Sequence, residues 1–157
     1  MIKVIGRNSI EAFELGNEPE LYSSFPWYYA ADGAGVVGRT NGWDFSIFNQ
    51  DYERVAAALG PVPLAGPTIG SLSWVDLSRF LADGPRISLV TLHRYPLWGC
   101  FNQSSADTYP TLDNLLSEFS SGGLAESLAP FVAIAHARGL KLRNDEMVPS
   151  CSTRNAE

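Results

Sequence analysis

The sequence predicts an α/β fold in which βαβ units build a parallel sheet. Segments with strand-like and helix-like apolar spacing alternate along the 157 residues. Apolar residues make up 45% of the chain and charged residues 18%, which provides enough apolar side chain for a buried core. The segment Ile87–His93 is β-branched and largely apolar, as is typical of a strand buried on both faces. Together these observations favour a parallel sheet over a sandwich or a helical bundle.

The first two strand candidates flank a long loop and a helix. A short strand is expected at 10–16, where it runs into a Gly-Asn turn. Residues 20–48 are rich in aromatic residues, glycine and polar groups, so we expect a long loop with a short helix. Apolar residues then recur at helical spacing over 48–59, and the Gly-Pro pair that follows should end this helix. The second short strand is expected at 62–66.

The next helix is expected just before the strand at 87–93. Ser73 and Asp76 have the spacing of a capping box, and apolar residues up to Leu81 form the stripe behind it. An Asp-Gly-Pro sequence should end this helix.

Two helices and a strand complete the pattern. One helix is expected to begin at Thr111, with leucines and Phe119 on one face. A second is expected over 124–135, with Gly139 as its C-terminal cap. A final strand is expected at 140–146.

Composition and charge restrict the class of partner. The net charge is -6, the isoelectric point is near 4.8 and no two lysine or arginine residues are adjacent, so nucleic acid and anionic lipid are not expected partners. The strongest apolar stretches, 87–92 and 128–135, are too short to span a bilayer. Residues 1–8 lack the apolar core of a secretory signal, so the protein is cytosolic as written or its true N-terminus is missing.

Residues 1–157 are expected to form one domain, since we find neither an internal repeat nor an interdomain linker. The sequence has four strand candidates, and their alternation with helices has no evident end. This domain is therefore expected to be a section of a larger fold.

A glycine pattern suggests a distant alternative from another class. Residues 33–38 read Gly-Ala-Gly-Val-Val-Gly and match the dinucleotide-binding pattern G-x-G-x-x-G. That site needs a helix directly after the glycines, whereas a turn is expected here. A nucleotide-binding domain would therefore require a helix that begins near Gly38.

The two histidines differ in their expected roles. Neither has partners at metal-ligand spacing, so neither a metal nor a cofactor is expected. His136 lies in a predicted helix, where a surface or packing role is expected. His93 lies at the carboxyl end of a buried strand, beside Arg94 and Tyr95.

Two carboxylates follow predicted strands and carry the functional prediction. Glu18 comes after the first strand, and Glu146 ends the last. An acid in such a place is most often a solvated cap, because an unpaired charge is costly to bury. In parallel α/β folds, however, ligands bind at the carboxyl ends of the strands. The two side chains are therefore candidates for opposite walls of one pocket.

Asn17-Glu18-Pro19 resembles the acid/base motif of the clan of (β/α)8-barrel retaining glycosidases. In that clan the acid/base glutamate ends the fourth strand and the nucleophile ends the seventh. Two predicted strands separate Glu18 from Glu146, which matches this count.

The wider sequence resembles glycoside hydrolase family 79, which contains β-glucuronidases and heparanase-like enzymes. The segments that carry this resemblance are 13–22 (FELGNEPELY), 64–67 (LAGP), 91–97 (TLHRYPL) and 142–147 (LRNDEM), with Cys100 and Cys151. The resemblance implies a partial (β/α)8 TIM barrel with about strands four to seven and their helices. Strands one to three, strand eight and the family's accessory β-sandwich are absent. It also implies a secreted protein, although no signal peptide precedes the chain.

The resemblance further implies a carbohydrate substrate, a β-linked glucuronic acid or a related β-glycoside. Glu18 would protonate the leaving oxygen, and Glu146 would attack the anomeric carbon and form a glycosyl-enzyme. This double displacement predicts carboxyl groups about 5–5.5 Å apart. Asn17 matches the position that hydrogen-bonds the sugar 2-hydroxyl, and Tyr95 matches a tyrosine near the nucleophile. His93 is expected to help form the floor of the site beside that tyrosine.

Further expectations concern aromatic residues and cysteines. Four aromatic residues are candidates for stacking on sugar rings, with core or loop packing as the simpler expectation: Trp27, Tyr28, Tyr29 and Trp43. Cys100 and Cys151 follow adjacent strands in the implied barrel, so a disulfide between their loops is expected if the protein is exported.

The sequence also departs from the family. After Glu146 it lacks the asparagine and the glycine-rich stretch that normally follow the nucleophile. The alternative from a different class is therefore a non-catalytic remnant of such a barrel, inactive on its own.

Overall fold

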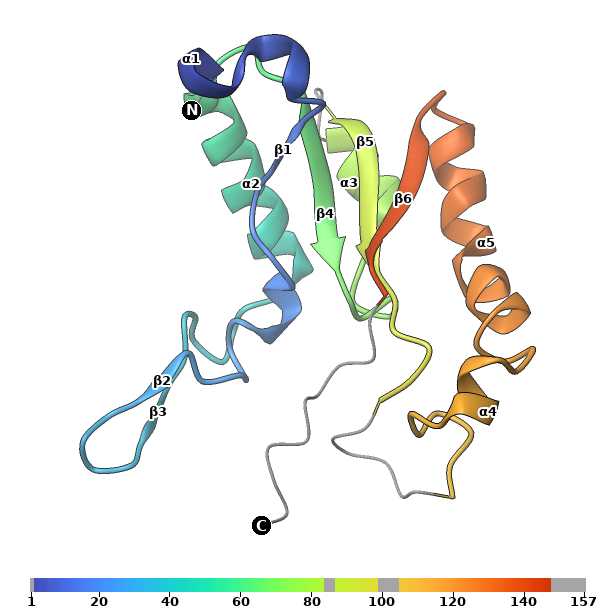
Figure 1. Cartoon of the computed structure of the whole chain (residues 1–157). Helices are drawn as coiled ribbons and strands as arrows, with labels where there is room; N and C mark the ends of the chain where they lie inside the picture. The colour runs from blue at the N-terminus through green and yellow to red at the C-terminus, as the bar shows by residue number, and fades with distance from the viewer. Residues whose placement is uncertain (1, 84–86, 99–104, 148–157) are drawn as a thin grey trace.

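The computed structural model describes residues 2–83, 87–98 and 105–147 (Figure 1). Its main sheet has four strands in the order β1-β4-β5-β6, and every neighbouring pair is parallel. The strands are β1 (Phe13–Glu14), β4 (Leu64–Ile69), β5 (Ile87–His93) and β6 (Lys141–Glu146). This arrangement confirms the predicted α/β fold with a parallel sheet.

Three helices pack against this sheet and enclose the apolar core. They are α2 (Phe45–Leu59), α3 (Leu77–Asp83) and α5 (Gly122–His136), which lie behind and beside the strands in Figure 1. Phe80 of α3 is fully buried, and its ring contacts those of Phe48 and Tyr52 from α2. Within the described residues, no helix combines the length and the apolar character needed to cross a membrane.

Helix α2 has the ends that its sequence predicts. Asp44 caps it, because its Oδ1 accepts a hydrogen bond of 2.9 Å from the N–H of Ile47. The helix stops at Leu59, where Gly60 has a φ of 74° that favours glycine. Gly139, which follows α5, has a φ of 69° and forms the predicted end of that helix.

Two predicted helices differ from the structure. Helix α3 begins at Leu77, and Asp76 caps it by accepting from the N–H of Arg79, so Ser73 is not the cap. The helix predicted from Thr111 is only α4 (Leu112–Leu115), with its leucines exposed. The hydroxyls of Ser117 and Ser120 both donate to the carbonyl of Asn114, and such bonds compete with helical ones.

The long loop contains a projecting hairpin that the sequence did not predict. Strands β2 (Tyr28–Tyr29) and β3 (Gly35–Val36) pair antiparallel and extend away from the main sheet (Figure 1). The glycine pattern 33–38 lies in this hairpin, and no helix begins between Gly38 and Asp44. The helix that the dinucleotide alternative requires is therefore missing. The remaining short elements are α1 (Ile2–Ile5) and the 3-10 helices η1 (Arg7–Ser9) and η2 (Pro19–Leu21).

Candidate active site

Glu18 follows β1 in a backbone conformation that residues with a side chain rarely adopt. Its φ is 46° and its ψ is 58°, in the left-handed region. Its N–H donates a 2.9 Å hydrogen bond to the carbonyl of Thr68, which itself has a φ of 59°. Each such residue costs about 1–3 kcal/mol, and residues of this kind concentrate at functional sites. The turn therefore holds Glu18 beside the carboxyl end of β4.

His93 ends β5 and lies at the centre of three carboxylates. Its side chain is 1% exposed, and its Nδ1 is 3.2 Å from Oε1 of Glu18. The same Nδ1 is 3.6 Å from Oε2 of Glu146, and Nε2 is 3.7 Å from Oδ1 of Asp145. Residues from the ends of three different strands thus meet at one imidazole ring.

The carboxylates around His93 favour its protonated form. Burial acts to lower the pKa of His93, but the hydrogen bond with Glu18 and the negative charges of Glu146 and Asp145 act in the opposite direction. The charges prevail, and the pKa lies above its ordinary value of 6.5. The imidazolium offsets part of the repulsion that two neighbouring carboxylates would otherwise feel.

Tyr95 contacts Glu146 from the segment that follows β5. Its hydroxyl donates a short hydrogen bond to Oε2 of Glu146, and the N–H of Arg94 donates to the carbonyl of Glu146 at 3.1 Å. Burial, together with the hydrogen bond to Glu146, raises the pKa of Tyr95 well above its usual 10. Tyr95 therefore remains a hydrogen-bond donor to this carboxylate at neutral pH.

Glu18 and Glu146 are close enough to act on one bond. One carboxylate oxygen from each, together with a ring nitrogen of His93, lie within 4.8 Å of one another. The same three atoms are the described group that a metal ion would use, with two oxygen ligands and one nitrogen. Without a metal, the arrangement offers two carboxyl groups for acid/base or nucleophilic chemistry. Their side chains are 20% and 41% exposed, so both reach solvent.

The other predicted site residues have different surroundings. Asn17 is exposed next to Glu18, and its backbone N–H donates to the hydroxyl of Tyr22. Trp43 is buried and donates from its indole N–H to the carbonyl of Pro19 at 2.7 Å, so it packs in the core. Cys100 and Cys151 lie outside the described residues.

The aromatic residues of the hairpin are on the surface, and His136 is also exposed, as the sequence predicts. Trp27, Tyr28 and Tyr29 are all more than 60% exposed.

The sequence prediction did not assign a role to several residues that surround the carboxylates. Asp145 precedes Glu146, and its Oδ1 lies 3.7 Å from Nε2 of His93. Partial burial raises the pKa of Glu14 on β1, and the neighbouring charge of Asp145 raises it further. Glu20 follows Glu18 by two positions, and its carboxylate binds the end of β4. Glu20 and Asp145 stand inside the motifs themselves, which is the only sequence signal that could have found them.

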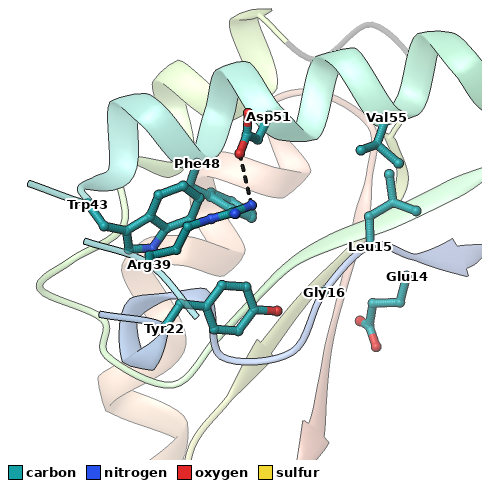
Figure 2. A pocket seen from close by; sticks show the side chains of 9 residues that line it. All are labelled: Glu14, Leu15, Gly16, Tyr22, Arg39, Trp43, Phe48, Asp51 and Val55. Atoms are coloured by element: carbon teal, nitrogen blue, oxygen red, sulfur yellow. Dashed lines mark hydrogen bonds and ion pairs between the residues drawn. The ribbon is translucent and has the colours of Figure 1, made fainter. Parts of the chain in front are cut away.

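A groove lies beside β1 and α2, apart from the carboxylate pair (Figure 2). Its volume is about 320 Å³. Arg39 crosses it, bound to Asp51 at 3.1 Å and stacked 4.7 Å from the ring centre of Trp43. The lining residues are Glu14, Leu15, Gly16, Tyr22, Arg39, Trp43, Phe48, Asp51 and Val55. Its mostly apolar wall adjoins β1, which pairs only with β4 among the described strands.

Comparison with known proteins identifies the architecture. No family model and no curated protein matches the chain. Among solved structures, the fold is similar to that of a GH39 β-xylosidase from Caulobacter crescentus, with a TM-score of 0.53 and 18% sequence identity. The match covers 98% of this chain and 29% of the xylosidase chain.

The chain has part of a TIM-barrel fold. At 18% sequence identity the likeness is one of fold alone. The chain spans less than a third of the length of this barrel neighbour.

Proposed function

We propose that this partial barrel carries the catalytic pair of a retaining glycoside hydrolase. Glu18 acts as the acid/base and Glu146 as the nucleophile. Glu18 protonates the glycosidic oxygen while a carboxylate oxygen of Glu146 bonds to the anomeric carbon, and the leaving group departs. Glu18 then removes a proton from water, which attacks the same carbon and releases Glu146 with net retention.

One observation carries this proposal: the approach of Glu18 and Glu146 to a shared nitrogen of His93. The two carboxylate oxygens lie within 4.8 Å of one another, at the ends of β1 and β6. Carboxyl groups that act by retention are about 5–5.5 Å apart, whereas inverting pairs are about 6.5–9.5 Å apart to admit a water. The short separation supports double displacement.

The proposed substrate is a β-linked glucuronic acid or a related β-glycoside. This choice rests on the sequence resemblance to family 79. Asn17, exposed beside Glu18, would bind the sugar 2-hydroxyl. Tyr95 would orient Glu146 and stabilise its charge, and His93 would hold the two carboxylates together.

A second candidate is a non-catalytic part of such a barrel. The observation in its favour is the small share of a barrel that the chain contains, 29% of the xylosidase chain. In addition, β1 and β6 each pair on one side only among the described strands.

Turnover of an aryl β-glucuronide separates the two candidates. The glycosidase proposal predicts release of the phenol by the wild-type chain and its loss in Glu146→Gln. Glu126→Gln is the matched control, because Glu126 is an exposed glutamate of α5. A folded wild-type chain that releases no phenol from this or any other aryl β-glycoside would support the non-catalytic candidate instead.

A further inference from the structure

Glu20 ties the turn that contains Glu18 to the end of β4. Its Oε1 accepts two backbone hydrogen bonds, 2.6 Å from the N–H of Gly70 and 2.7 Å from the N–H of Ser71. The partners are 50 and 51 positions away in the chain, so these bonds join two separate strand ends. Bonds from N–H groups to a carboxylate are stronger than those between neutral groups.

The carboxylate of Glu20 is partly buried. Its Oε2 is buried and has no hydrogen-bond partner among the described residues. Burial raises the pKa of Glu20, while the N–H groups of Ser71 and Gly70 act to lower it and the charge of Glu18 raises it further. Burying a carboxylate costs free energy, so Glu20 is not an ordinary solvated surface group.

Gly70 is the point where the carboxylates of Glu18 and Glu20 meet. A Cβ atom added to Gly70 would lie 2.9 Å from Oε1 of Glu18 and 3.1 Å from Oε1 of Glu20. Gly70 has no positive φ that would exclude a side chain, so the conflict of a Cβ here is with these two carboxylate ends, which would have to shift.

We infer that Glu20 and Gly70 form a positioning device for Glu18, which we call the Glu20–Gly70 clamp. Glu20 anchors the turn through the two backbone N–H groups, and Gly70 provides the space in which the carboxylate of Glu18 faces His93. The hydrogen bonds to Glu20 fix the backbone of the turn, and the contact with Gly70 fixes the carboxylate of Glu18. The inference rests on the proposed function only in that it takes Glu18 to be the acid/base.

The clamp is tested first by a measurement that needs no turnover. In protein labelled with ¹³C at the glutamate carboxyl carbons, the chemical shift of the Glu18 carboxyl carbon is compared at one fixed pH in the wild type and in Gly70→Ala. The clamp predicts a changed shift in Gly70→Ala, because the new methyl group pushes the carboxylate away from its position. Gly42→Ala is the control, since a Cβ at Gly42 meets nothing within 4 Å and its φ is not positive.

Two substitutions at Glu20 distinguish the loss of its hydrogen bonds with Gly70 and Ser71 from a general loss of stability. Glu20→Gln keeps an oxygen that can accept from Gly70 and Ser71, whereas Glu20→Ala removes it. We expect the amide proton shifts of Gly70 and Ser71, and the carboxyl ¹³C shift of Glu18, to change strongly in Glu20→Ala and to be partly restored in Glu20→Gln. If Glu20→Ala does not fold, Gly70→Ala and Glu20→Gln decide the question. A Glu18 carboxyl shift that keeps its wild-type value in every folded variant overturns the clamp.

The activity of the same variants provides a second measurement. A displaced acid/base should lower kcat for a β-glucuronide by about ten- to a hundredfold with little change in KM, since small misplacements have such effects. Gly42→Ala should retain wild-type kcat. If the wild type is inactive on every glycoside while the carboxyl ¹³C shift of Glu18 still responds to Gly70→Ala, the clamp stands and the glycosidase proposal fails.

Discussion

Glu18 and His93, 75 positions apart in the chain, lie with Oε1 and Nδ1 3.2 Å from each other. The contact joins the turn after β1 to the end of β5, across the intervening strand β4. Because Nδ1 also lies 3.6 Å from Glu146, one buried ring sets the relation between both proposed catalytic groups. The predictions below follow from this arrangement and from the core that supports it.

Loss of the acid/base should depend on the leaving group. Glu18→Gln should lower turnover of an alkyl β-glucuronide by about 10²–10⁴-fold, which is the usual contribution of general acid catalysis. A dinitrophenyl glycoside needs little protonation to depart, so its cleavage should be far less affected. Steady-state rates with the two substrates measure this difference. Equal losses on both would contradict the role assigned to Glu18.

Tyr95→Phe should weaken the nucleophile and leave the fold intact. The substitution removes the hydroxyl that donates to Glu146 and keeps the ring. A hydrogen bond to a charged group contributes about 1.5–3 kcal/mol, so we expect kcat to fall by roughly tenfold or more. Tyr109→Phe serves as a control, because Tyr109 lies before α4 and, among the described residues, no hydrogen bond joins its hydroxyl to Glu18, His93 or Glu146. Unchanged kcat in Tyr95→Phe would show that the hydroxyl has no part in the reaction.

The charge of His93 should make stability depend on pH. The pKa of His93 is raised in the folded chain, so its contribution is fully present below the unfolded value of about 6.5 and is lost as pH rises through the folded value. The free energy of unfolding of the wild type, measured against that of His93→Gln, should therefore fall as pH rises from about 6 to 9. Urea denaturation of both proteins across this range provides the measurement. A constant difference would mean that the pKa of His93 is the same in the folded and the unfolded chain.

Phe80 should be among the most sensitive positions of the core. It is fully buried and contacts the rings of Phe48 and Tyr52 at centroid distances of 6.4 and 4.9 Å. Phe80→Ala should cost about 3–5 kcal/mol of unfolding free energy. Leu116→Ala is the control, because Leu116 is 76% exposed and its loss should change stability by less than about 0.5 kcal/mol. Denaturation midpoints that fall equally in the two variants would contradict this core.

The regular part of the fold could be predicted because its signals are local. Ile87–His93 is largely apolar and forms β5, and the helical spacing that ends before Gly60 forms α2. The helix predicted from Thr111 was too long, because apolar spacing does not show where serine hydroxyls donate to backbone carbonyls. The hairpin was missed because its strands are only two residues each, Tyr28–Tyr29 and Gly35–Val36.

The site could be predicted in part for a similar reason. Parallel strands end at the same edge of a sheet, so Glu18 and Glu146 could be expected to approach each other. The contact of His93 with both carboxylates depends on side-chain orientation and on the register shift between Leu92 and His93. The bonds of Glu20 reach across 50 positions, and no local pattern predicts such a pair.

The central claim is that Glu146 forms a covalent bond to the sugar. A dinitrophenyl 2-deoxy-2-fluoro-β-glucuronide tests this most directly, because the fluorine slows hydrolysis of the glycosyl-enzyme after the dinitrophenolate has departed. Mass spectrometry of the digested protein should find one sugar attached to the peptide that contains Glu146, and none on Glu146→Gln. A folded wild-type chain that remains unlabelled, or a label on any other residue, would contradict the account.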